Sequence, residues 1–92
     1  MVKKAIEALV EGRLQGVGYR SSIQQQATRL GIKGYVRNCS GNKVQIIAEG
    51  NEDALCKLID FLQKGPTRAE VENYNIEWIE PQEDFFRFSI KY

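Results

Sequence analysis

The chain has 92 residues, of which 13 are basic and 12 acidic, so its formal net charge is +1. This length is enough for one two-layer core and too short for a second, so we expect residues 1–92 to form a single domain. A charge this close to zero gives no extended field that would hold a nucleic-acid duplex or a membrane surface, and any anion must be bound locally.

The chain begins with a strand pattern and then a helix pattern. Apolar and polar residues alternate over 5–14, which is typical of a half-buried strand. From Tyr19 the apolar spacing becomes that of a helix. Ser21 or Ser22 is a suitable capping residue at its start, and Gly31 stands where a helix ends.

The next segment predicts a β-hairpin. Residues 32–38 alternate again, and Asn38 lies on the face that carries the apolar side chains of this run. Gly41-Asn42 suits a tight turn with glycine at its first central position. The chain then returns as a strand over 43–49.

The second half predicts another helix and two more strands. Asn51 caps a helix with one apolar stripe, and Gly65-Pro66 ends it. An alternating strand follows over 71–79, and a last alternating run covers 86–92.

This order of elements predicts an α+β fold of the ferredoxin-like class, a split βαβ sandwich with the order βαββαβ plus a short terminal strand. Two helices should cover one face of an antiparallel sheet. The first two strands then run in the same direction with the third between them, so their ends meet at one edge. We therefore expect Arg20 and Asn38 to lie roughly 10 Å apart there, within reach of one small anion.

The stretch 12–20 predicts a phosphate-binding loop. Gly16 and Gly18 allow backbone conformations that turn successive NH groups toward one point. The start of the following helix adds its own NH groups and the positive end of its dipole. Arg20 supplies a planar fork of donors that suits a phosphoryl group. The predicted phosphate-binding residues are Gln15, Gly16, Val17, Gly18, Tyr19 and Arg20.

Several motifs in register resemble those of the acylphosphatase family. The segment 12–20, G-R-L-Q-G-V-G-Y-R, is similar to the phosphate-loop signature of that family. The segment 30–38, L-G-I-K-G-Y-V-R-N, is similar to its second signature. The resemblance continues through 48–50, 64–66 and 69–71 and so spans nearly the whole chain.

The resemblance implies hydrolysis of the carboxyl-phosphate bond of acyl phosphates. We expect the chain to need no metal ion or other cofactor. Arg20 would hold the phosphoryl group and Asn38 would orient the attacking water; these two are the predicted catalytic residues. The alternative is a regulatory module of the same fold that binds phosphate without turning it over. We expect a standalone enzyme whose partners are a small acyl phosphate and, as product, inorganic phosphate.

Other phosphate chemistries lack the residues that they need. The chain contains no histidine, so histidine-based phosphoryl transfer is excluded. A cysteine-phosphatase loop needs cysteine six positions before Arg20, where Leu14 stands, and no Walker-type Gly-Lys-Ser/Thr sequence occurs. The acidic residues show no metal-ligand spacing, and we assign them to solvated faces and a helix start. They are Glu7, Glu11, Glu49, Glu52 and Asp53.

The remaining features predict a cytoplasmic monomer that binds neither nucleic acid nor membrane. Tyr35 could belong to an RNA-binding sheet face, but 43–50 has no aromatic residue at the stacking positions. Acidic residues interrupt any N-terminal signal peptide, and no stretch approaches the length of a membrane span. Cys39 and Cys56 are expected to be free thiols without a redox role.

Overall fold

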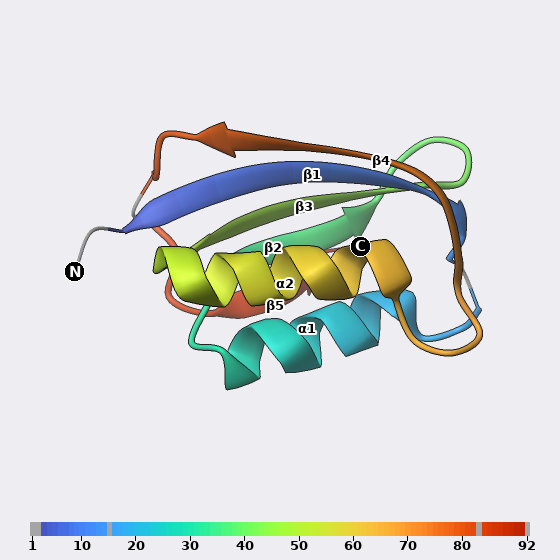
Figure 1. Cartoon of the computed structure of the whole chain (residues 1–92), viewed down its shortest axis with the longest axis horizontal. Helices are drawn as coiled ribbons and strands as arrows, with labels where there is room; N and C mark the ends of the chain where they lie inside the picture. The colour runs from blue at the N-terminus through green and yellow to red at the C-terminus, as the bar shows by residue number, and fades with distance from the viewer. Residues whose placement is uncertain (1–2, 15, 83, 92) are drawn as a thin grey trace.

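The computed structural model describes residues 3–14, 16–82 and 84–91. The five strands form one sheet in the order β4-β1-β3-β2-β5, and both helices pack on the same face of it (Figure 1). The predicted ferredoxin-like order of elements is thereby confirmed. The elements are β1 (Lys4–Arg13), α1 (Tyr19–Arg29), β2 (Lys33–Asn38), β3 (Lys43–Gly50), α2 (Glu52–Lys64), β4 (Glu70–Ile79) and β5 (Phe88–Lys91).

The topology brings three chain segments to one end of the molecule. Strand β3 lies between β1 and β2 and is antiparallel to both, so β1 and β2 run in the same direction. Both end on the side where α1 begins (Figure 1). The last turn of α2 reaches the same side, because α2 runs opposite to α1.

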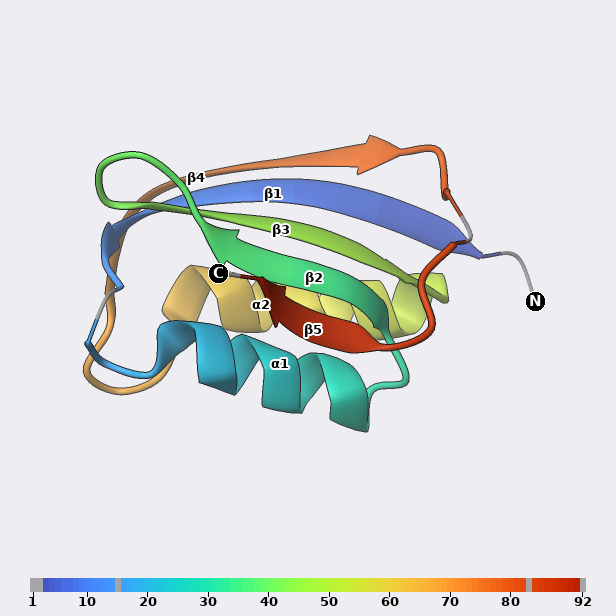
Figure 2. The same cartoon turned by 180° about the vertical axis from the view of Figure 1, so that it is seen from behind.

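The last strand makes the sheet mixed, whereas the sequence predicted an antiparallel one. Strand β5 pairs in parallel with β2, from Gly34 opposite Phe88 to Arg37 opposite Lys91 (Figure 2). The reason is the path of the connection. Strand β4 ends where β2 begins, and the chain crosses that end of the sheet before it enters β5 beside the start of β2.

The core lies between the sheet and the two helices. Alternate side chains of the central strands point to the helix-covered face, and each helix contributes one apolar stripe, as the periodicities predicted. No helix among the described residues is long and apolar enough to cross a membrane. The fully buried core residues include Ile6, Ala8, Val10, Val36, Ile46 and Ala48 from the strands and Ile23, Ala27, Leu55, Leu58 and Leu62 from the helices.

The hairpin between β2 and β3 differs from its prediction. The register pairs Asn38 with Val44, and the Cys39 NH donates to the Lys43 carbonyl at 2.8 Å. Three residues therefore lie between the hydrogen-bonded pair Cys39 and Lys43, and the predicted two-residue turn is wrong. A connection of three residues shifts the centre of the turn to Gly41, whose φ is +73°.

Glu49 was assigned to a solvated face, and this assignment is wrong. Only 2% of Glu49 is exposed, and its Oε2 accepts a hydrogen bond of 2.6 Å from the Gln82 NH. A buried carboxylate requires such a donor to offset its lost hydration. The connection from β4 to β5 supplies it while crossing the sheet, a contact that no local pattern indicates.

Tyr19 ties the start of α1 to the end of α2. Its ring is 1% exposed, and its hydroxyl donates a 2.8 Å hydrogen bond to the Leu62 carbonyl. In a regular helix this carbonyl would accept from the NH four residues later, but that residue is Pro66, which has none. Burial raises the pKa of the Tyr19 phenol well above its ordinary value, so the hydroxyl stays protonated and able to donate.

Tyr19→Phe should lower the free energy of unfolding by about 1–3 kcal/mol, because the buried Leu62 carbonyl then loses its donor. Urea denaturation of both proteins measures the difference. Tyr74→Phe is the matched control, since half of Tyr74 is exposed. If both variants changed stability by the same amount, the hydrogen bond from the Tyr19 hydroxyl to the Leu62 carbonyl would not stabilise the fold.

Candidate active site

A pocket of about 210 Å³ lies where β1 and β2 end and α1 begins. Its lining comes from the loop after β1, the first turn of α1, the last residue of β2 and the edge strand β5. The described lining residues are Leu14, Gly16, Gly18, Tyr19, Arg20, Ser21, Asn38 and Ile90.

The start of α1 has no side-chain cap. Its N-cap residue is Gly18, and among the described residues no side-chain capping hydrogen bond is found there. The first bond of the helix runs from the Ser22 NH to the Gly18 carbonyl at 2.9 Å. The NH groups before Ser22 therefore have no carbonyl within the helix to donate to, and the residues that carry them, Tyr19, Arg20 and Ser21, line the pocket.

The start of α2 shows the opposite arrangement. The Asn51 Oδ1 accepts from the Ala54 NH at 2.8 Å, as predicted, and Glu52 and Asp53 place negative charge in the first turn. The first turn of α1 contains no acidic residue. Of the two helix starts, the one at α1 is therefore suited to an anion, because no carboxylate or cap competes for its NH groups.

The predicted capping role of Ser21 or Ser22 is wrong. Both serines lie inside α1, because the helix begins at Tyr19 and its N-cap is Gly18. Gly18 has a φ of +77° and Gly16 a φ of +74°, in the left-handed region that glycine adopts most readily. An added Cβ at either position would meet nothing within 4 Å, so backbone conformation and not space requires glycine here.

Arg20 and Asn38 line the same pocket, as the predicted topology requires. Arg20 is half-buried in the first turn of α1, and Asn38 is exposed at the end of β2. Arg20 is the one cationic side chain among the described lining residues, and none of them is acidic. The arrangement therefore offers a guanidinium and backbone NH groups for an anion, with a neutral amide beside them.

The other predicted phosphate-binding residues have different positions. Gly16, Gly18 and Tyr19 line the pocket, but the Tyr19 side chain is used in the contact with α2, which leaves its backbone for an anion. Val17 packs against the core and is not among the lining residues. Gln15 lies outside the described residues.

Sequence reasoning did not include Leu14, Ser21 and Ile90 among the site residues, although all three line the pocket. Ser21 directly follows Arg20, and a helix start placed at Gly18 would have indicated it. Ile90 carried no such signal, because the pairing of β5 with β2 depends on the path of a long connection.

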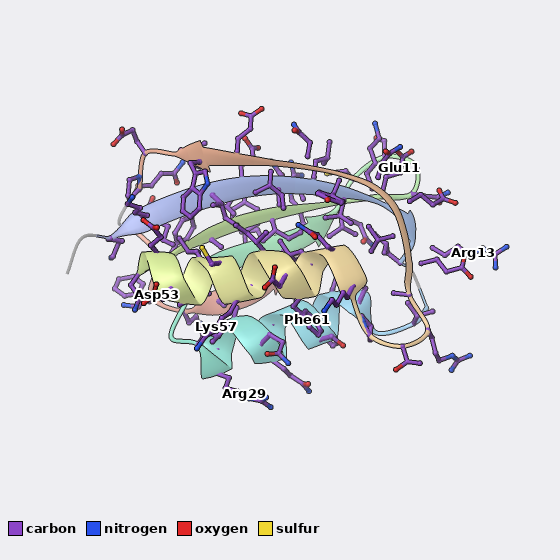
Figure 3. All side chains as sticks on the ribbon, in the orientation of Figure 1. Glu11, Arg13, Arg29, Asp53, Lys57 and Phe61 are labelled. Atoms are coloured by element: carbon purple, nitrogen blue, oxygen red, sulfur yellow. The ribbon has the colours of Figure 1, made fainter. Side chains whose placement is uncertain are left out.

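Arg13 belongs to the predicted loop stretch but not to the pocket. It lies at the same end of the molecule and points outward from the end of β1 (Figure 3). Its Nη1 is 4.0 Å from the Glu70 Oε1, and both side chains are mostly exposed. Such a surface ion pair contributes little to stability.

The family model for acylphosphatase matches residues 6–90. The chain belongs to the acylphosphatase family. A curated acylphosphatase from Dehalococcoides mccartyi (strain CBDB1) is 41% identical over 88 residues, which is 95% of this chain and 97% of that protein. The acylphosphatase of Caldivirga maquilingensis is 43% identical over 88 residues, covering 95% and 93%. The crystal structure of the acylphosphatase from Bacillus subtilis superposes with a TM-score of 0.91 at 32% identity, covering 97% and 99%.

The family resemblance predicted from the sequence is thereby confirmed. These relatives match over nearly their whole lengths, so the likeness extends through both helices and the sheet and is not confined to the glycine loop. The assignment as an acylphosphatase enzyme with a ferredoxin-like fold follows from it.

Inorganic phosphate should raise the melting temperature, because we expect it to bind the folded site and not the unfolded chain. At about ten times Kd the stabilisation is roughly 1.4 kcal/mol, which shifts Tm by several degrees in a domain of this size. Differential scanning calorimetry should show the shift in the wild type and in Asn38→Ala but not in Arg20→Ala. Chloride at the same ionic strength should not reproduce it. Equal shifts in the wild type and Arg20→Ala would place the anion elsewhere.

Proposed function

We propose that this chain hydrolyses the carboxyl-phosphate bond of acyl phosphates to a carboxylate and inorganic phosphate, with Arg20 and Asn38 as its catalytic residues. The observation that carries the proposal is their position in one pocket, at a helix start without a cap, in a member of the acylphosphatase family.

Arg20 and the NH groups of the loop would hold the phosphoryl group. Phosphoryl transfer passes through a loose transition state whose charge spreads over three equatorial oxygens. The guanidinium donates two hydrogen bonds in one plane, and the NH groups before Ser22 are already oriented by the backbone. Such preorganised donors stabilise the transition state more than water does, because they need no reorganisation.

Asn38 would orient the attacking water. Its side-chain carbonyl accepts a hydrogen bond from water, and its NH₂ group donates. Because the amide is neutral, it leaves the phosphoryl group unrepelled, whereas a carboxylate at this position would repel it.

The leaving group explains why so few residues suffice. An acyl phosphate releases a carboxylate, which is a weak base and needs little help from a general acid. The chain has no histidine. Charge stabilisation by Arg20 and the backbone would therefore account for the reaction without a metal ion or another cofactor.

We also propose an oligomeric state, a class of partner and a cellular compartment for this enzyme. We propose that residues 1–92 act as a monomer and as a single unit, because Arg20 and Asn38 lie in the same pocket of the chain. A net charge of +1 supports a small substrate and no nucleic-acid partner. We place the reaction in the cytoplasm.

Release of phosphate from acetyl phosphate or benzoyl phosphate should proceed at the same rate with and without EDTA, because the mechanism uses no metal ion. A colorimetric phosphate assay measures it. Folded protein that binds phosphate but releases none from either substrate would favour the regulatory module instead.

Arg20→Lys should retain less than about a tenth of the wild-type kcat/KM, because lysine keeps the charge but not the planar pair of donors. The same assay measures this loss. Circular dichroism should show an unchanged fold, since Arg20 lines an open pocket. Activity close to that of the wild type would contradict a two-pronged contact.

Asn38→Ala should lower kcat about 10²- to 10³-fold with little change in KM, the pattern of an interaction made mainly in the transition state. Steady-state kinetics with benzoyl phosphate separates the two constants. A large rise in KM at unchanged kcat would instead assign Asn38 to substrate binding.

A further inference from the structure

Four exposed residues border the opening of the pocket. Of its described lining residues, Leu14 and Tyr19 are buried, and Arg20 and Ile90 are half-buried. Gly16, Gly18, Ser21 and Asn38 are exposed, so these four residues form the border of the pocket toward solvent.

The geometry of the reaction divides this border into two sides. In phosphoryl transfer the attacking and leaving oxygens lie roughly in line on opposite sides of phosphorus. If Asn38 orients the water, the leaving carboxylate departs on the side away from Asn38. The remaining exposed border residues are Gly16, Gly18 and Ser21.

Ser21 differs from the two glycines because it has a side chain. We propose that Ser21 contacts the acyl group of the substrate and determines which acyl groups the enzyme accepts. This inference rests on the proposed function, and it adds a specificity-determining residue and a substrate class to it.

The chemistry of Ser21 sets that class. A serine hydroxyl is small and uncharged, and it can donate or accept one hydrogen bond. None of the described residues at the opening carries a charge. A second anionic group on the acyl portion would therefore meet no cation there, so the favoured substrates are acyl phosphates with an uncharged acyl group.

The position in α1 provides a matched control. Ser21 and Gln25 are both exposed and one turn apart on the same face of the helix, and Gln25 does not line the pocket. A rise of 1.5 Å per residue places Gln25 about 6 Å farther along the axis. Phenylalanine at either position places the same aromatic ring on the exposed face of α1, but only at position 21 would that ring border the opening.

The test compares kcat/KM for benzoyl phosphate and acetyl phosphate in the wild type, Ser21→Phe and Gln25→Phe. The phenylalanine ring at position 21 can pack against the benzoyl ring, so the benzoyl-to-acetyl ratio should rise about three- to tenfold. In Gln25→Phe the ratio should equal that of the wild type. Competitive inhibition by inorganic phosphate should stay within about twofold in all three, because the backbone donors to the phosphoryl group are retained.

The other outcomes separate an error about Ser21 from an error about the proposed function. An unchanged ratio in an active Ser21→Phe variant, or the same change in Gln25→Phe, would overturn the role of Ser21 while leaving the proposed function intact. A changed phosphate inhibition constant with an unchanged ratio would also overturn it, since Ser21 would then act at the phosphoryl end. A wild type that binds phosphate and hydrolyses neither substrate would instead contradict the proposed function.

Discussion

The candidate site is built on a helix start that no described side chain caps. Backbone NH groups at the first turn of α1 lack partners within the helix, and such groups need an acceptor from elsewhere. The rest of the chain holds this turn in place. The Tyr19 hydroxyl bonds the Leu62 carbonyl, which Pro66 cannot serve, so the ends of the two helices are joined beneath the pocket.

The fold brings side chains from two strands to this helix start. Because β3 is inserted between β1 and β2, the ends of these parallel strands emerge beside α1, and Asn38 reaches the pocket with Arg20. Strand β5 completes one side with Ile90. In the proposed mechanism, a phosphoryl group in this pocket would meet a guanidinium and backbone NH groups, and the neutral amide of Asn38 would hold the attacking water. A reaction with a good leaving group requires little more.

The sequence predicted the features that depend on local patterns. Alternation and helical spacing identified the elements, and the order of elements brought Arg20 and Asn38 to one end. The errors concern contacts between distant segments or small shifts in where an element begins. Strand β5 pairs in parallel because of the path before it, and the buried Glu49 accepts a hydrogen bond from the Gln82 NH, 33 positions later. Ser21 looked like a cap because serine suits that role, whereas Gly18 starts the helix in the left-handed conformation.

The most direct test of this account is a titration of ¹⁵N-labelled protein with inorganic phosphate, followed by the chemical shifts of the backbone amides. We expect the largest shifts at Gly16, Gly18 and Ser21, around the start of α1. The amides of Asp53 and Ala54, at the capped start of α2, should stay unchanged. Shifts of equal size at the two helix starts, or shifts confined to α2, would contradict the claim that the open helix start binds the phosphoryl group.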